Sequence, residues 1–272
     1  MIRAAVRWTA LTLSAILFLV PFYLLLRNGL ASRAEITSPG WTWWPKQVHW
    51  ENLAKLFQQP DVPFARSILN SVIVAVLQTV GLLVLCSLAG YGLARVPSRY
   101  AKPVFYAVLA TLMIPTSVTF VPSFVVVSSL GWLSDFRGLV IPGLFSAFSV
   151  FLFRQYFLDF PRELEDAGRV DGLTRWGVFR RIVVPNSRGF FAAIAVITVI
   201  GSWNAFLWPL IIAQSPDSWT VQVALSGLLT AQNPQLNLLF LAAALSILPI
   251  VFLFAFLQRY LVRGVMEAGL KG

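Results

Sequence analysis

Residues 159–185 read DFPRELEDAGRVDGLTRWGVFRRIVVP, a charged stretch that lies between long apolar runs. Asp159 is a residue type that caps helix starts, and Pro161 suits a first helical turn. Gly172 can adopt the left-handed conformation that ends a helix. The stretch therefore predicts a short helix of about ten residues that is closed by a glycine turn.

A second helix is predicted directly after that turn. Thr174 is a good N-terminal cap, and Trp176, Phe179 and Val183 follow at spacings of three and four residues, which places them on one apolar face. Pro185 is expected to end this helix. Residues 159–189 thus form a helix, a turn and an amphipathic helix.

Two interpretations of this loop are consistent with its residues. A hairpin on the membrane surface would place four arginines against lipid phosphates, namely Arg175, Arg180, Arg181 and Arg188. A docking element for a cytoplasmic partner would instead use the charged helix ends. The acids Glu163, Glu165 and Asp166 favour docking, because an anionic bilayer would repel them.

The composition of the chain indicates a membrane protein. Of its 272 residues 58% are hydrophobic and only 12% are charged, whereas about a quarter of the residues of a soluble domain are charged. Membrane helices also tolerate proline and glycine, of which there are 16 and 17. We expect an all-α integral membrane fold.

Six segments are apolar and long enough to cross a bilayer as helices, which takes about 20 residues. They lie near residues 8–26, 67–94, 104–130, 139–157, 190–213 and 236–257. They predict one transmembrane domain over residues 1–272, with a first helix (8–26), an outer loop (28–66), a five-helix core (67–257), the charged loop (159–189) and a tail (259–272).

The basic residues orient these spans, because arginine and lysine near membrane ends stay preferentially in the cytoplasm. With the N-terminus inside, only six of the 21 basic residues fall outside: Arg27, Arg33, Lys46, Lys55, Arg66 and Arg137. Both termini and the charged loop are then cytoplasmic. The first span exceeds the apolar region of a signal peptide, so we expect it to be retained.

Tryptophans gather in the predicted outer loop, at Trp41, Trp43, Trp44 and Trp50. Tryptophan favours the membrane interface, where its ring is apolar and its edge is wet. An interfacial collar is therefore expected in preference to a sugar-stacking site.

The sequence lacks the residues that several kinds of chemistry require. The chain's four lysines precede Gln47, Leu56, Pro103 and Gly272, so it lacks the Gly-Lys-Ser/Thr of a phosphate-binding loop. One cysteine and one histidine exclude clusters of these ligands within one chain. The basic residues are scattered between apolar runs, which disfavours nucleic-acid binding. We expect no enzyme and no cofactor.

Ion-coupled transport is also disfavoured. Secondary carriers usually place ionisable residues inside their membrane helices, and all eleven acids fall outside the six predicted spans. Backbone carbonyls can also bind sodium, so this alternative stays open. A membrane scaffold that transports nothing is the other alternative.

The run Glu165-Asp166-Ala167-Gly168-Arg169-Val170-Asp171-Gly172 resembles the EAA loop of bacterial ABC importer permeases. Asp166 stands where the family pattern has a second alanine. The resemblance implies a type I ABC importer transmembrane fold in which this loop is the coupling helix that docks in the ATPase subunit. The implied coupling residues are Glu165, Asp166, Ala167, Gly168, Asp171, Gly172, Phe179 and Pro185.

Other segments resemble the carbohydrate-uptake branch of that family, from about Asn70 to the end of the chain. They are Asn70-Ser71, the run from Ala89 to Arg95, Met113-Ile114-Pro115, the run from Trp203 to Pro209, and Gln258 to Gly264. Together they are most similar to the second, six-helix permease of heterodimeric, maltose-type sugar importers.

This resemblance implies a set of partners in the bacterial cytoplasmic membrane. They are a second permease subunit, two ATPase subunits that bind ATP and magnesium, and an extracytoplasmic solute-binding protein. A sugar or sugar-like solute is expected, with a glycerophosphodiester or another polar solute as the alternative. Residues 214–235 resemble the loop that reaches the binding protein, and residues 265–272 occupy the place that contacts the ATPases.

Polar and aromatic residues within the spans are candidates for the solute path: Asn70, Gln78, Thr116, Ser117, Ser149, Trp203, Asn204 and Trp208. Such side chains can line a hydrated cavity or stack on a sugar ring. They equally often tie one helix to another. For each residue the packing role is the more common one.

Overall fold

The computed structural model describes residues 2–269, and every regular element in that range is helical. Three helices are continuous, long and apolar enough to cross a membrane: α1 (Ile2–Gly29), α4 (Phe64–Arg95) and α15 (Leu236–Gly269). They contain the predicted spans 8–26, 67–94 and 236–257. Residues 270–272 of the predicted tail lie outside the described residues.

Two further predicted spans are bent. The span 104–130 consists of α5 (Ala101–Thr111) and α6 (Thr116–Ser129), which meet at 96°. The span 139–157 consists of α7 (Phe136–Val140), a 3-10 turn and α8 (Ala147–Asp159), with a bend of 42°. Pro115 and Pro142 stand at these breaks, where each removes a backbone donor.

The predicted span 190–213 is interrupted as well. Helix α12 (Arg188–Trp203) ends before Asn204, and α13 (Leu207–Ile212) begins after a short break. Pro209 has no amide hydrogen to donate to the carbonyl of Ala205, which a continuous helix would require. Counting each bent pair as one span, including Arg175–Asn186 with α12 at 77°, residues 2–269 hold up to six crossings.

The charged loop folds into the predicted hairpin with two corrections. Its helices are α9 (Arg162–Val170) and α10 (Arg175–Val178), and the latter continues through a π-helical turn (Phe179–Val183) into α11 (Val184–Asn186). Asp159 is the last residue of α8 and caps nothing, because Pro161 holds the N-cap position of α9. The helical path also passes Pro185, because the first turn of α11 needs no donor there.

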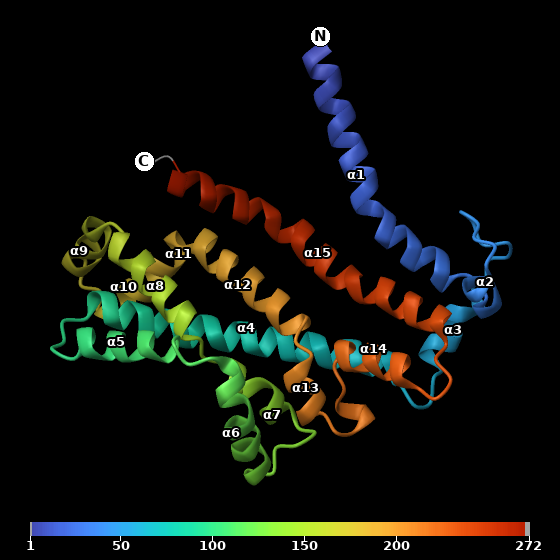
Figure 1. The fold of residues 1–272 in the computed structure, drawn as a ribbon. Coiled ribbons are helices and arrows are strands. Elements are labelled where there is room, and N and C mark those ends of the chain that lie inside the picture. The colour runs from blue at the N-terminus through green and yellow to red at the C-terminus, as the bar shows by residue number, and fades with distance from the viewer. Residues whose placement is uncertain (1, 270–272) are drawn as a thin grey trace.

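The two ends of the molecule carry different elements (Figure 1). Helices α9 and α10 lie at one end of α4, and α2 (Arg33–Thr37), α3 (Glu51–Phe57) and α14 (Val221–Thr230) lie at the other. The long helix α15 runs back from the α14 end towards the α9 end. The N-terminal part of α1 stands apart from the other helices, and its apolar side chains are exposed.

The outer loop is ordered around a buried ion pair. Arg27 Nη2 lies 2.7 Å from Glu35 Oε1, and this carboxylate also accepts from the hydroxyl of Thr42 and the amide of Lys46. The predicted collar tryptophans, Trp41, Trp43, Trp44 and Trp50, are all exposed. Tyr23 on α1 packs against two of these rings, so the cluster sits beside the C-terminal half of α1.

The main core lies between α4, α8 and α12, next to the charged loop. It contains Tyr91, Phe153, Phe157, Phe179 and other buried side chains. Helices α4 and α8 approach closely at Gly90, where an added Cβ would lie 2.6 Å from the Cβ of Phe153 and 2.9 Å from the amide nitrogen of Arg154. The absence of a side chain at Gly90 therefore permits this packing.

A pair of glycines on α4 tests this contact. We expect Gly90→Ala to destabilise the protein by about 1–3 kcal/mol, because the extra methyl overpacks a tight helix contact. Gly92→Ala is the matched control, since nothing lies within 4 Å of its added Cβ, and it should be neutral or stabilise the helix by about 0.5–1 kcal/mol. Thermal unfolding in detergent, followed by tryptophan fluorescence, measures both; equal effects would contradict the close approach.

Candidate functional site

The carboxylate of Glu165 lies buried at the junction of α9 and α4, with only 2% of the residue exposed. Arg95 Nε lies 2.9 Å from Glu165 Oε1, and the hydroxyl of Tyr91 donates to Glu165 Oε2 at 2.9 Å. Arg169, one turn further along α9, lies 3.8 Å from Oε2. The carboxylate therefore meets both a positive charge and a hydroxyl donor from α4.

Helix geometry explains why α4 offers both partners. Tyr91 and Arg95 are four residues apart at its last turn, so their side chains lie on one face. Arg95 also donates to the backbone carbonyl of Phe160, the residue that ends α8. One arginine thus joins the end of α4, the end of α8 and the first turn of α9.

The turn after α9 has the hydrogen bonds of a Schellman motif. The amide of Gly172 donates to the carbonyl of Arg169 at 3.0 Å, and the amide of Leu173 donates to the carbonyl of Gly168 at 2.9 Å. Gly172 has φ of +84°, a conformation that strains residues with a Cβ. The predicted left-handed stop at Gly172 is confirmed.

Gly168 has a different role within the same hairpin. A Cβ at this position would lie 2.3 Å from Cδ1 of Ile182 and 3.4 Å from Cδ1 of Leu173. The two arms of the hairpin therefore touch at Gly168. Thr174 then caps α10 as predicted, with its hydroxyl oxygen accepting from the amide of Gly177 at 3.2 Å.

The second arm is built into the core and does not lie loosely on the surface. Phe179 and Val183 of the predicted apolar face are buried, and the ring of Phe179 lies 4.9 Å from that of Tyr91. Trp176 is 57% exposed, so the predicted face buries two of its three members. A π-helical turn runs from Phe179 to Val183 and changes the helical periodicity between these two buried residues.

The outward face of α9 combines charge with unpartnered apolar side chains. Asp166, Ala167 and Asp171 are exposed. Val170 is 88% exposed, which is unusual for an apolar residue on a helix with so many charges. Such a mixed surface on a rigidly held helix is suited to contact with another protein.

Four candidate path residues are tied to backbone carbonyls inside the chain. Asn70 Nδ2 donates to the carbonyls of Asp217 and Trp219 at 2.8 and 2.9 Å. Gln78 Nε2 donates to Leu139, Trp203 Nε1 to Ser246 and Trp208 Nε1 to Gly138, at 2.9, 3.1 and 3.0 Å. Asn70 and Trp203 are also buried, so they join one element to another.

The remaining candidates differ in their surroundings. Ser149 is buried at the start of α8, and its amide is capped by Ser146. Thr116, Ser117 and Asn204 have exposed side chains at two of the three proline-associated breaks, those at Pro115 and Pro209. These three polar groups are therefore open to contacts with a solute or another chain.

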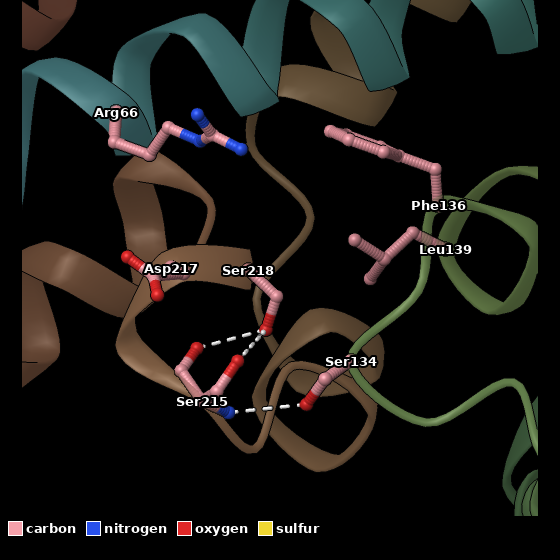
Figure 2. A pocket seen from close by; sticks show the side chains of 7 residues that line it. All are labelled: Arg66, Ser134, Phe136, Leu139, Ser215, Asp217 and Ser218. Atoms are coloured by element: carbon pink, nitrogen blue, oxygen red, sulfur yellow. Dashed lines mark hydrogen bonds between the residues drawn. The ribbon is translucent and has the colours of Figure 1, made fainter.

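A pocket of about 130 Å³ lies between the start of α4, the start of α7 and the turn before α14 (Figure 2). Arg66 of α4, Phe136 of α7 and Asp217 of the turn before α14 lie on its walls. Nearby, Asp135 caps α7 and pairs with Arg137, and these hydrogen bonds hold the pKa of the Asp135 carboxyl below its usual value. That cap therefore stays ionised at neutral pH.

Ser134 holds this pocket together. Its amide donates to the carbonyl of Ile212 at 2.8 Å, and its hydroxyl oxygen accepts from the amides of Gln214 and Ser215 at 3.0 and 3.1 Å. It does so with φ of +54°, the one positive value among the described residues other than glycine. A strained serine thus fixes the loop after α13 against the start of α7.

Sequence reasoning missed three residues that organise these sites: Tyr91, Arg95 and Ser134. Tyr91 and Arg95 lie in a run singled out for its resemblance alone, and their four-residue spacing at the end of a span was the available signal. Ser134 carried no signal, because its backbone conformation and its partners 80 residues away appear only in the fold.

Removing the partner of a buried carboxylate is expected to be costly. We expect Arg95→Ala to destabilise the protein by about 3–5 kcal/mol, since Glu165 would remain buried without its cation. Arg99→Ala is the matched control, because Arg99 is exposed and contacts only Tyr100 among the described residues. Chemical denaturation of both variants in detergent tests this. Equal stability of the two would contradict the role of the ion pair.

The clamp at Ser134 predicts a local effect. Ser134→Ala removes the acceptor of two backbone amides. The free energy of local opening should therefore fall by about 1–3 kcal/mol. Hydrogen exchange of the peptide that contains residues 213–216 should then quicken, and that of α4 should not change. Ser129→Ala removes an exposed hydroxyl that bonds only within its own helix. The same acceleration in that variant would overturn the assignment.

Comparison with known proteins gives a consistent family match. Residues 86–267 match the family model of the binding-protein-dependent transport system inner membrane component. The arabinooligosaccharides transport system permease protein AraQ of Bacillus subtilis (strain 168) is 33% identical over 95% of this chain and 92% of its own. The lactose transport system permease protein LacG of Rhizobium radiobacter is 34% identical over 96% and 94%.

Two other matches extend the comparison. The sn-glycerol-3-phosphate transport system permease protein UgpE of Yersinia pestis bv. Antiqua (strain Antiqua) is 29% identical over 95% of this chain and 94% of its own. A solved bacterial ABC transporter involved in the import of the acidic polysaccharide alginate superposes with a TM-score of 0.84 at 20% identity, covering 95% of this chain and 96% of that one. This likeness concerns the fold.

Proposed function

The chain belongs to the binding-protein-dependent transport system inner membrane components and is a non-catalytic ABC importer permease, and from this membership we propose that it carries a sugar or sugar-like solute. The resemblance read from residues 165–172 is confirmed at the level of the family. As an ABC permease it works with an ATPase and a binding protein, and it is a multi-pass protein of the inner membrane. Nucleotide chemistry therefore belongs to the ATPase partner.

The observation that carries the coupling role is the burial of Glu165 under an exposed docking face. Because Arg95 and Tyr91 hold this carboxylate, α9 moves with the end of α4 as one body. A push on α9 from the ATPase is thereby transmitted to a helix that crosses the membrane. This supports a switch in which ATP binding shifts the population of two permease conformations.

The coupling residues divide by position. Asp166, Ala167 and Asp171 are exposed and form the contact face, and Gly168 and Gly172 shape the hairpin. Phe179 carries the motion into the core through its contact with Tyr91. Pro185 begins the last turn of the hairpin before α12. Glu165 links the contact face to α4.

The solute path is proposed to use the polar groups left open at the two breaks, Thr116, Ser117 and Asn204. Helix breaks leave backbone and side-chain polar groups available in the membrane, which is where transporters build binding sites. Asn70, Gln78, Ser149, Trp203 and Trp208 then hold the surrounding helices in place. A phosphorylated glycerol or similar solute is the second candidate, favoured by the similarity to UgpE.

A second permease subunit is proposed to complete the path in a heterodimer. The exposed apolar surface of α1 and α6 supports this, because one chain leaves both helices without partners on most of their faces. The α9 end is proposed to face the cytoplasm, since it carries the loop at which the ATPase is proposed to dock, and α15 runs towards that end. Both termini are accordingly proposed to be cytoplasmic, with the α14 end facing the binding protein.

The left-handed turn at Gly172 provides a test of coupling. An added Cβ there meets no atom within 4 Å, but a β-branched residue is strained at φ of +84°, at a cost of about 1–2 kcal/mol. We expect Gly172→Val to reduce uptake by the reconstituted importer at least about tenfold per ATP hydrolysed, because the docking helix is reoriented. Gly172→Asn should retain most uptake, since asparagine tolerates this conformation.

Gly131→Val is the matched control for this experiment. Gly131 also has a positive φ, of +68°, and open space around it, but it lies between α6 and α7. It should lose comparable stability and keep uptake coupled to ATP hydrolysis. Normal coupling in Gly172→Val, or equal uncoupling in Gly131→Val, would count against the docking role.

The solute class is tested on the binding protein and the assembled importer. Calorimetry with arabino-oligosaccharide, lactose and sn-glycerol-3-phosphate identifies which class the binding protein takes, and uptake of the same radiolabelled compound into proteoliposomes follows. A sugar that binds and is transported supports the first proposal. Transport of the phosphate ester alone would replace it with the second.

A further inference from the structure

A cavity of about 470 Å³ lies between the end of α4, α9 and the start of α10. Four arginines and two carboxylates line it: Arg95, Arg162, Arg169, Arg175, Glu165 and Asp166. The lining therefore carries two positive charges in excess. A cavity of this charge favours an anionic occupant.

The two carboxylates are already paired, and they do not serve all four arginines. Arg95 is paired with Glu165, and Arg169 Nη1 lies 3.1 Å from Asp166 Oδ1. No ion pair within the described residues involves Arg162 or Arg175. The positive excess of the cavity therefore resides on these two side chains, one on each arm of the hairpin.

We propose that this cavity receives an acidic side chain of the ATPase subunit, held between Arg162 and Arg175. This rests on the proposed docking of the ATPase at the charged loop and names the chemistry of one contact within it. The guanidinium fork of arginine matches a carboxylate bidentately, which makes such a contact specific as well as attractive. The volume also admits the neighbours of the inserted residue.

A protein carboxylate fits the surroundings better than a lipid phosphate. Glu163, Asp166 and Asp171 are exposed on or next to α9 and would face an anionic bilayer unfavourably. Ala94, Val96 and Pro97 line the same cavity, and they offer apolar contacts beside the charged ones. The combination of an arginine pair with an apolar rim resembles the centre of a protein interface.

The proposed contact would also connect the two arms of the hairpin mechanically. An acid that bridges Arg162 and Arg175 would join the first helix of the hairpin to the second, across the turn at Gly172. The docked ATPase would then add a second link between the two arms, beside their contact at Gly168. Glu165 stays committed to Arg95, so the inserted acid adds a new bridge and displaces no existing one.

Charge reversal tests this in the assembled importer held in lipid nanodiscs. We expect Arg162→Glu with Arg175→Glu to weaken association of the purified ATPase subunit at least about tenfold, which corresponds to about 1.4 kcal/mol. Arg162→Lys with Arg175→Lys should weaken it less, because charge remains and the bidentate geometry is lost. Arg180→Glu is the control, since Arg180 is exposed on the same loop and lies outside the cavity.

A second measurement identifies the inserted residue. Exposed acids of the ATPase subunit are changed to lysine one at a time, and one of them should restore binding to the doubly reversed permease. Thermal unfolding of each variant confirms that the permease is folded. Unchanged ATPase binding by the doubly reversed protein, or equal loss with Arg180→Glu, would overturn the proposal.

The remaining outcomes separate the cavity from its alternatives. If the effect of reversal disappears in discs of phosphatidylcholine alone and appears only with phosphatidylglycerol, the occupant is a lipid headgroup and the proposal is wrong. If the unmodified permease fails to bind the ATPase, the docking function itself is overturned. If the unmodified permease binds the ATPase normally and charge reversal has no effect, the proposed role of the cavity is wrong and the docking function stands.

Discussion

The buried carboxylate of Glu165 sets the position of the helices that meet at the α9 end of the molecule. A carboxylate withdrawn from water is strongly unfavourable unless a cation and hydrogen-bond donors replace its hydration. Arg95 and Tyr91 do so from the last turn of α4. Because Arg95 also holds the carbonyl of Phe160, three chain segments must come together before the charge is satisfied. The hairpin is thus placed by electrostatics and then fixed by the packing of Phe179.

Much of this arrangement was predictable from residues that act locally. Gly172 and Thr174 end one helix and begin the next through hydrogen bonds to near neighbours, and both were identified from sequence. Three spans were found as continuous helices because apolar length alone defines them. The breaks at Pro115, Pro142 and Pro209 were missed. Hydropathy averages over such positions, and a proline in a membrane helix is often tolerated without a break.

The site residues also divide into those that a local sequence pattern identifies and those that only the fold reveals. The side chain of Asn70 looked like a candidate for solute contact, yet its carboxamide is occupied by two carbonyls nearly 150 residues away. No local pattern reveals such a partner. Arg95 looked like one of many cytoplasmic basic residues, whereas its neighbour Glu165 makes it a structural centre. The sequence identified the loop correctly. Only the structure distinguishes the side chains that hold the loop in place from those that are exposed on its surface.

The contact between α1 and α15 has a consequence for biosynthesis. Gly29, at the end of the first membrane helix, lies against the backbone of Leu241, more than two hundred residues later. The ribosome delivers α15 to the membrane long after α1, so α1 waits in the bilayer while the chain between them is made. Closure between the first and last helices is a contact of very high sequence separation, and such contacts form late. The exposed flank of α1 is therefore available to other membrane proteins throughout synthesis. The topology of the chain thus determines the order in which its helices assemble.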